Sequence, residues 1–489
     1  MHRRFRFLAL GIALFAAACG RGNEGALDVA IVGQTSDTFQ EGLLLSTAGQ
    51  HVRAATTEGL VSLDAQGQVT TALADRWIVT DDGRSYIFRL REGTWPDGSE
   101  LTGESARTAL QQVVRQLRGT SLGLDLSQIA EIRAMAGRVV EIRLKGPMPD
   151  FLQLLAQPEL GLTHKGRGTG PMGLRRTGDT AILSMLPPER RGLPVDERWQ
   201  EQVREVRVQS LPVAQAVALF DEGAVDVVLN GRIEDLPRVD TGPLSRGTVR
   251  IDPAMGLFGL MVRQADGVLA DAATREAISM AIDRDALIAP FNVGGWTATT
   301  RIVAPGLDTD LGTIGERWTG MSRQERRVSA AGRILAWQAD NGDDPAEISI
   351  QLPQGPGGDI LFNRLAADMA NIGITLRRVA EGEVPQLELV DRVARYANAL
   401  WFLNQFNCTL KRGLCSPAAD DRVAEAGVAP DPAARAALLA EAEAELTAEN
   451  AFIPLGHPIR WSLVRGGIDS FAANPFVFHP LPQLAMIPR

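Results

Sequence analysis

Alternating apolar and polar positions between residues 58 and 117 predict a meander of short strands followed by a helix. Residues 77–79 and 86–90 alternate in the manner of half-buried strands. The sequences DAQG, DDG and PDG punctuate this region, and Asp with Gly is typical of tight turns because Gly tolerates a positive φ. From Thr102 to Leu117 apolar residues recur on one helical face, so we expect an amphipathic helix with Thr102 as its cap.

Strands and helices alternate along the rest of the chain. Strands are predicted at residues 27–32, 139–144, 225–229, 348–352 and 374–376, and helices at 150–156, 213–220, 271–282, 324–339, 359–371 and 431–450. A strand, a helix and a second strand in close succession imply parallel pairing. We therefore expect an α/β fold.

Length and charge limit the class of protein. The chain has 489 residues, 45 % of them hydrophobic and 22 % charged, and its net charge is −9. This length exceeds what a single core serves, so two or three domains are expected. An acidic chain is a poor partner for nucleic acid, and none is expected. After residue 19 no stretch reaches the ~20 apolar residues of a membrane span.

The first 19 residues have the composition of a bacterial secretion signal. Arginines stand at positions 3, 4 and 6, residues 7–15 are mostly apolar, and three alanines precede Cys19. This order is typical of a signal peptide over residues 1–18. The small residues before the cysteine resemble a lipobox, which implies a lipid-anchored Cys19, a tether over residues 19–26 and a periplasmic protein held on the membrane. A plain signal peptide with an accidental cysteine is the alternative.

Several segments carry the motifs of one family. Between residues 58 and 107 the order is EGL, a Trp strand, DDG, WPDG and SELTGESAR. Residues 140–156 read VEIRLKGPMPDFLQLLA and residues 274–288 read TREAISMAIDRDALI. Together these segments resemble the family 5 extracellular solute-binding proteins, the receptors of ABC importers for peptides, nickel and related solutes. Ser105 stands where the family usually has an acid.

The resemblance implies a fold and a mechanism. The family has a two-lobed periplasmic-binding-protein fold of type II with an additional subdomain in the first lobe. Here that implies lobe I at residues 27–50, 165–254 and 456–489, the inserted subdomain at 51–164 and lobe II at 255–455. It also implies a monomeric receptor that captures a peptide or peptide-like small solute by hinge closure and delivers it to a permease with separate ATPase subunits. A degenerate cleft with a structural, sensory or chaperone role is the alternative.

Two loops are candidates for ligand contacts on the strength of this resemblance. Thr35 and Ser36 follow the first strand, at a loop that faces the cleft in the family; a plain solvated loop is the alternative. Gly170 and Met172 belong to GTGPM, which resembles the family's GTGPY turn near the cleft; a purely structural turn is the alternative. The same residues fit G-x-G-x-x-G, but the proline at 171 and the lack of a following helix exclude a dinucleotide site.

Trp401 and Asn404 are the candidates in the second lobe. In peptide-binding relatives a Trp precedes an Asp-rich segment whose carboxylate meets the α-amine of the ligand. Here WFLNQFN has an amide, Asn404 or Asn407, in that region. An amide carries no full charge, so the departure shifts the expectation toward a neutral, modified or anionic solute. Trp401 is interpreted either as a stacking surface for the ligand or as a core residue.

Cysteines and histidines add little chemistry. In an oxidising compartment Cys408 and Cys415 are expected to form a disulfide, with two buried thiols as the alternative. The five histidines do not stand at metal-ligand spacing, so no metal and no cofactor are expected. Nucleophile-elbow, zinc-protease and P-loop motifs are missing from the sequence. The sequence therefore does not predict an enzyme.

Overall fold

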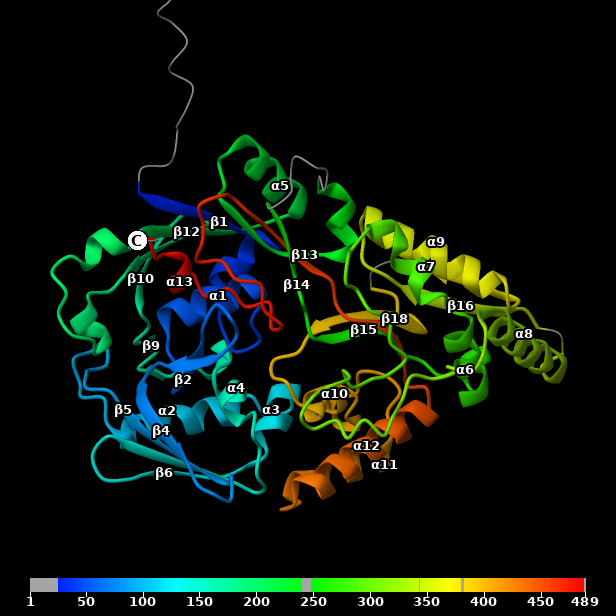
Figure 1. Ribbon diagram of the computed structural model, residues 1–489, viewed down its shortest axis with the longest axis horizontal. Helices are drawn as coiled ribbons and strands as arrows, with labels where there is room; N and C mark the ends of the chain where they lie inside the picture. The colour runs from blue at the N-terminus through cyan, green and yellow to red at the C-terminus, as the bar shows by residue number, and fades with distance from the viewer. Residues whose placement is uncertain (1–24, 240–247, 343, 380–381, 488–489) are drawn as a thin grey trace, which may run out of the picture.

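The computed structural model describes residues 25–239, 248–342, 344–379 and 382–487. The predicted signal peptide, Cys19 and nearly all of the tether lie outside these residues. Two groups of elements lie side by side along the longest axis of the molecule (Figure 1). We call the group around the seven-stranded sheet lobe I, the group around the four-stranded sheet the subdomain, and the group around the five-stranded sheet lobe II.

The sheet of lobe I has the strand order β10-β11-β12-β1-β13-β20-β14. Its strands are β1 (Ala26–Val32), β10 (Met172–Thr177), β11 (Thr180–Met185), β12 (Glu205–Leu211), β13 (Val227–Arg232), β14 (Val249–Asp252) and β20 (Arg460–Val464). The helices of this lobe are α1 (Thr47–Thr56), α5 (Val213–Glu222) and α13 (Leu481–Leu484). The central strand β1 pairs in parallel with β12 and β13. It is buried on both sides, with Leu27, Val29 and Ile31 in one core and Ala30 in the other.

The subdomain is an antiparallel meander backed by a helix. Its sheet runs β4 (Ala74–Val79), β5 (Ser85–Leu90), β7 (Val139–Leu144), β6 (Ile129–Ala134), and the hairpins are β2 (Val61–Leu63) with β3 (Val69–Thr71) and β8 (Thr163–His164) with β9 (Arg167–Gly168). Its helices are α2 (Gly103–Gln116), α3 (Ser121–Leu126) and α4 (Phe151–Leu155). The side chain of Thr102 accepts a hydrogen bond from the Ser105 amide, and Ser105 Oγ accepts one from the Thr102 amide. Ser105 therefore completes a capping box at the start of α2.

Lobe II is built on a mixed five-stranded sheet. The order is β17 (Ile374–Arg378), β16 (Ala346–Gln351), β18 (Leu387–Val393), β15 (Gly256–Val262), β19 (Phe452–Gly456). The first set of helices comprises α6 (Ala272–Ala281), α7 (Arg284–Ile288), α8 (Arg323–Asp340) and α9 (Pro356–Ala370). The parallel pairing of β16 with β17 around α9 confirms the prediction from the strand and helix order.

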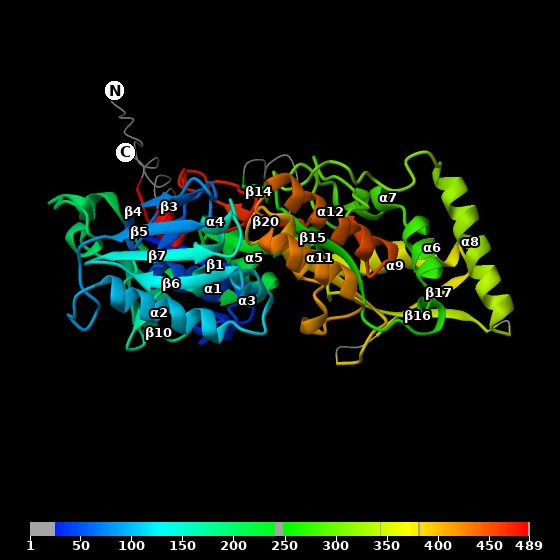
Figure 2. The ribbon, with the colours of Figure 1, turned by 90° about the horizontal axis from the view of Figure 1, so that it is seen from below.

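A second helical layer of lobe II packs against the subdomain. It consists of α10 (Ala399–Asn404), α11 (Pro417–Val428) and α12 (Pro432–Ala448). Leu122 and Phe151 of the subdomain belong to the same hydrophobic core as Leu400 and Phe402 of α10. Figure 2 shows the long helices α11 and α12 beside the subdomain end of lobe II. The subdomain and lobe II are therefore in direct apolar contact in this structure.

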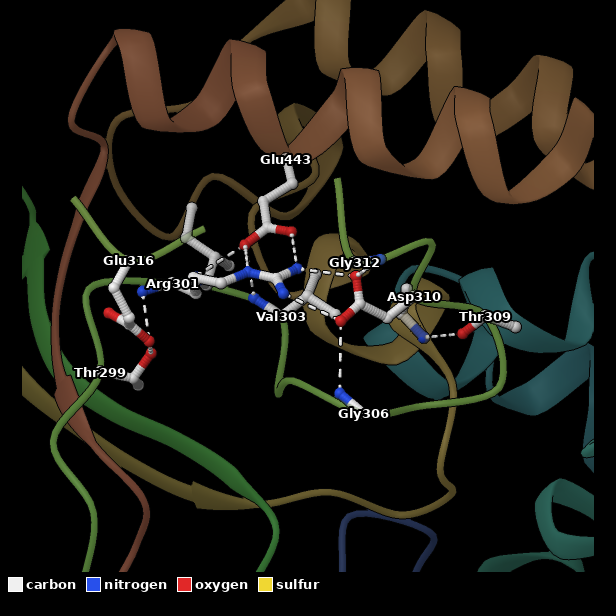
Figure 3. Close-up of polar contacts among 11 residues, drawn as sticks. Thr299, Arg301, Val303, Gly306, Thr309, Asp310, Gly312, Glu316 and Glu443 are labelled. Carbon is white, nitrogen blue, oxygen red and sulfur yellow. Dashed lines mark hydrogen bonds and ion pairs between the residues drawn. The ribbon is translucent and has the colours of Figure 1, made fainter. Parts of the chain in front are cut away.

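A buried ionic cluster fixes the long connection before α8 onto α12 (Figure 3). The Arg301 guanidinium donates to both carboxylate oxygens of Asp310, at 2.9 and 3.1 Å, and to those of Glu443, at 2.8 and 3.3 Å. Burial by itself lowers the pKa of Arg301, but the hydrogen bonds to the two acids outweigh it and raise the pKa overall. Next in sequence to Asp310, Thr309 Oγ1 accepts the backbone N–H of Ala399 at 3.0 Å. The cluster thus supports the first turn of α10.

The chain crosses between the two large sheets twice, from β14 to β15 and from β19 to β20. Both connections are short. Strand β14 ends at Asp252 and β15 begins at Gly256, while β19 ends at Gly456 and β20 begins at Arg460. Paired short crossings of this kind are typical of a hinge. In the described part of the chain no helix combines the length and the apolarity needed to cross a membrane.

Candidate functional site

A cavity of about 620 Å³ lies where lobe I, the subdomain and lobe II meet. Lobe I contributes the segment from Gln40 to His51, the ends of β13 and β20, and residues 476–478. The subdomain contributes the segment from Leu117 to Leu122 and Glu159. Lobe II contributes residues 391–395, Trp401, Gln405 and Arg412. Segments far apart in the sequence therefore line one open cleft between separately folded parts.

Helix α10 places Trp401 on the wall of this cavity. The Asn398 side chain caps the helix by accepting the Leu400 amide at 2.9 Å. The indole is 3 % exposed and meets the Phe402 ring edge-on, with 5.0 Å between ring centroids. Trp401 thus belongs both to the hydrophobic core and to the cavity lining, which combines the two interpretations drawn from the sequence.

A bidentate ion pair bridges the cavity from lobe II to the subdomain. Arg395 Nη1 lies 2.7 Å from Glu159 Oε2, and Arg395 Nη2 lies 2.9 Å from Glu159 Oε1. Gln157 adds to the contact, because its Nε2 donates to the Arg395 carbonyl at 2.8 Å. Glu159 is 1 % exposed, and Gln50 Nε2 also donates to its Oε1 at 3.1 Å, so the buried carboxylate has polar partners on both sides. We call Arg395, Glu159 and Gln157 the latch.

A second pair joins the two large sheets. Arg460 Nη1 lies 2.8 and 2.7 Å from the two carboxylate oxygens of Asp391, and Arg460 Nη2 donates to the Asp391 carbonyl at 3.2 Å. Arg460 begins β20 of lobe I and Asp391 lies in β18 of lobe II. The carboxylate of Asp391 is therefore already neutralised within the protein.

Two further arginines share one neutral acceptor. Gln405 Oε1 accepts from Arg412 Nη1 at 2.8 Å and from Arg392 Nη1 at 3.4 Å. Burial, followed by repulsion from Arg392 and Arg263, lowers the pKa of Arg412 to about 10. Burial also lowers the pKa of Arg392. Both guanidinium groups remain charged at neutral pH.

His51 contributes no charge to the cavity. Burial lowers its pKa to about 4, and its Nδ1 lies 2.7 Å from the carbonyl oxygen of Thr47. The ring is therefore neutral at pH 7.

Of the six predicted ligand-binding residues, Trp401 lines this cavity. Asn404 is 4 % exposed, lies behind the wall, and donates through Nδ2 to Asp125 Oδ1 at 2.6 Å. Asp125 lies in α3 of the subdomain, and burial raises its pKa to about 7 despite the opposing hydrogen bond from Asn404. The Asn404 amide is therefore engaged with a carboxylate across the interface.

The four other predicted residues lie apart from the lining. Thr35 and Ser36 are exposed in a 3₁₀ turn (Thr35–Phe39), and the chain reaches the cavity only at Gln40. Gly170 packs against the end of α1, where a Cβ would come within 2.1 Å of the Thr56 carbonyl carbon. Met172 begins β10 and is buried in the core of lobe I. The turn that contains both residues therefore serves packing in this structure.

The predicted disulfide is present between Cys408 and Cys415, with the Cα atoms 5.3 Å apart. It closes the loop that carries Arg412. Leu414 of this loop donates its backbone N–H to the Val262 carbonyl at 2.7 Å, which ties the loop to β15.

Sequence reasoning missed the charged lining of the cavity. Arg395 and Glu159 are 236 positions apart in the sequence, and no local pattern links them. Arg460 offered a signal, because a charged residue within the apolar run IRWSLV needs a buried partner. Arg412 offered a weaker signal of a functional role: it lies in a short disulfide loop, which holds its residues in fixed positions.

The described residues contain no group of three or more His, Cys, Asp or Glu side chains able to hold a metal ion.

Comparisons with known proteins identify the family. Residues 68–377 match the family model described as "Bacterial extracellular solute-binding proteins, family 5 Middle". The chain is 22 % identical to the periplasmic oligopeptide-binding protein OppA of Salmonella typhimurium over 471 residues, which cover 85 % of this chain and 84 % of that protein.

Solved structures agree on the fold. Haemophilus influenzae OppA, in complex with the peptide RPPGFSPFR, superposes with a TM-score of 0.77 at 16 % identity, over 95 % of this chain and 99 % of that one. Brucella suis NikA, in complex with Fe(III)-EDTA, gives 0.72 at 17 % identity, over 95 % and 100 %. The match to the family model covers more than half of the chain, so the protein belongs to family 5 of the bacterial extracellular solute-binding proteins, which are transporter receptors and not enzymes.

Proposed function

We propose that this protein is the receptor of a peptide-type ABC importer and captures a peptide-like small solute in the cavity between its lobes. The observation that carries the proposal is the cavity of about 620 Å³, enclosed by lobe I, the subdomain and lobe II together. A site built from both sides of a hinge binds its solute most completely when the lobes are closed. The peptide RPPGFSPFR in the complex of Haemophilus influenzae OppA supports this solute class, because that protein has the same fold.

The latch supports closure as the mechanism. Arg395 and Glu159 form a bidentate pair across the interface, and the apolar core continues from the subdomain into α10. Both contacts exist only while the lobes are together. Solute binding then favours the closed receptor, which docks on the permease while partner ATPase subunits supply energy.

The N-terminus fits a lipid-anchored periplasmic receptor in this proposal. Cys19 carries the lipid after removal of residues 1–18, residues 19–26 form the tether, and the receptor acts as a monomer. The same proposal places lobe I at residues 27–50, 165–254 and 456–489, the inserted subdomain at 51–164 and lobe II at 255–455. The first boundary falls within α1, whose core residues Ala48, Val52 and Ala55 all pack in lobe I. Cys19→Ser is expected to move the protein from the membrane fraction to the soluble periplasmic fraction, and an unchanged distribution would contradict the anchor.

A ligand screen tests the proposed function. Purified protein is titrated calorimetrically with dipeptides to pentapeptides, after a thermal-shift survey that also includes opines and metal chelates. A specific peptide-like solute is expected to bind with one-to-one stoichiometry and to raise the Tm by mass action. Binding of metal chelates alone would contradict the peptide-like class.

One observation favours the alternative of a receptor fold without transport. The apolar core shared by the subdomain and α10 would be exposed by wide opening of the lobes. A structural, sensory or chaperone lipoprotein could use such a permanently closed form. If no small solute in the screen binds, that result would support the alternative.

A further inference from the structure

The cavity has an excess of positive charge. Among the described residues its lining includes five arginines and two carboxylates. Arg395 is paired with Glu159 and Arg460 with Asp391. Arg232, Arg392 and Arg412 have no carboxylate within ion-pair distance among the described residues, and the buried His51 is neutral. Acids act on the last two arginines at longer range, Glu388 on Arg392 and Asp125 on Arg412.

Two of these three arginines are held next to one another. Arg392 and Arg412 each donate a hydrogen bond from Nη1 to Gln405 Oε1. Gln405 Nε2 in turn donates to the Trp401 carbonyl at 3.0 Å. This last bond fixes which end of the amide faces the guanidinium groups. Arg412 also reaches across the cavity, where its Nη2 lies 3.3 Å from Ser121 Oγ of the subdomain. The two guanidinium groups are thus positioned by neutral acceptors.

Nearby acids do not neutralise the pair. Glu388 is bound by Arg263, with 3.0 Å between Oε2 and Nε. Arg263 also contacts the Arg412 carbonyl, so the Arg263–Glu388 pair lies beside Arg412 and adds no net charge. Asp125 is buried with Asn404, and burial raises its pKa to about 7, so it is only partly ionised at neutral pH.

Like charges placed together in a partly buried site cost free energy, and the cost is relieved when an anion binds between them. Guanidinium groups suit oxyanions because their N–H donors match two oxygens at once. Trp401 lines the same cavity as Arg392 and Arg412, and its indole supplies an apolar surface for the rest of a solute.

We propose that Arg392 and Arg412 form an anion subsite of the cavity, and that the transported solute carries a carboxylate or a comparable oxyanion which these two arginines bind. This inference rests on the proposed function, because it defines the solute class of the same cavity.

The first experiment uses small anions and does not depend on a peptide. Succinate and inorganic phosphate are titrated into the purified protein, and tryptophan fluorescence and calorimetry report binding. Saturable binding is expected, with loss in Arg392→Gln and Arg412→Gln. The matched control is Lys411→Gln, an exposed cation of the same disulfide loop outside the cavity lining. Binding that is absent, or equal in all variants, overturns the subsite.

The second experiment uses matched peptides. Ala-Glu-Ala is compared with Ala-Gln-Ala, and each free C-terminal carboxylate with its amide. The acidic member of each pair is expected to bind more tightly, and Arg412→Gln is expected to weaken it by about tenfold to a hundredfold, the effect of one charged hydrogen bond. Affinity should fall as salt rises.

The outcomes separate the two claims. Tight binding of neutral or cationic peptides, unaffected by the arginine variants, overturns the anion subsite and leaves the proposed function standing. Anion binding that needs both arginines, without any peptide binding, supports the subsite and overturns the peptide-like class.

Discussion

At the scale of single residues, buried charges determine how lobe II is held together. Arg301 connects Asp310 and Glu443, and Glu443 Oε1 also accepts the backbone N–H groups of Ile302 and Val303 at 3.1 Å each. One guanidinium group therefore compensates two buried acids. Removal of Arg301 leaves both without a partner cation, which is the costly way to break a buried ionic cluster.

We therefore expect Arg301→Met to destabilise the protein by about 3–5 kcal/mol, measured by urea unfolding at pH 7. The matched control is Arg422→Met, because Arg422 forms only exposed pairs with Glu425 and Glu441. It is expected to change the stability far less than Arg301→Met, because exposed ion pairs are screened by water. Equal effects of the two changes would contradict the role of the cluster.

Asp125 predicts a pH dependence of stability. Its pKa is raised from the ordinary 3.8 to about 7 by burial, so the folded protein retains a proton that the unfolded chain releases. The free energy of unfolding should therefore be highest below pH 4 for this group and fall as pH rises to about 7. Asp125→Asn removes this contribution while keeping an acceptor for Asn404.

The measurement compares Asp125→Asn with the unmodified protein by urea unfolding at pH 5 and pH 8. The variant is expected to gain stability relative to the parent at pH 8, and less so at pH 5. A difference between the two proteins that does not change with pH would show that Asp125 does not titrate in this range.

At the scale of elements, the sequence patterns correctly predicted helices and strands that depend on interactions between neighbouring residues. The helix capped by Thr102 and the strand at 139–144 were confirmed, because capping and alternation are properties of adjacent residues. The strands that were not predicted include β6, β15 and β18, and also β10, β11, β12, β14 and β20 of lobe I. Strand β15 is buried at every position, so it shows no alternation, and β18 is half-buried on both faces.

In the candidate site, too, only the parts with a local sequence motif could be predicted. The Trp401 segment was found through a local motif, whereas the latch and the arginine pair arise from contacts between distant segments. The Gly168–Met172 turn shows the converse. Its motif is local and recognisable, but in the fold its glycines allow close packing against α1 and do not line the cavity.

The disulfide loop is the element whose loss should be most informative. A double variant, Cys408→Ser with Cys415→Ser, is expected to lose about 2–3 kcal/mol of stability, because the closed loop restricts the unfolded chain. The same loop carries Arg412, so the affinity for small anions should fall as well. Thermal unfolding with and without a reductant measures the first effect, and an unchanged Tm on reduction would contradict it.

At the scale of the whole molecule, the closed arrangement depends on contacts between parts that fold around separate sheets. The latch is the polar contact whose removal should favour opening. We expect Glu159→Gln to weaken solute binding severalfold through the population of the closed state, since the Arg395 side chain is partly exposed and recovers hydration when the lobes separate. Small-angle scattering of the solute-free variant should show a larger radius of gyration, and an unchanged radius would contradict the latch.

The shared apolar core gives the closed form a stability of its own. Wide opening would expose Leu122, Phe151 and Phe402, and the loss of apolar burial opposes it. The solute therefore adds to an existing preference, and the motion is expected to be limited in extent.

The most direct test of capture by closure is the distance across the cavity in solution. Spin labels are placed at Glu41 of lobe I and Lys411 of lobe II, both exposed and each next to a lining residue of its own lobe. Pulsed electron resonance is recorded with and without a saturating solute from the ligand screen. The account predicts that solute shortens and narrows the distance distribution. A distribution that stays the same when solute is bound would contradict it.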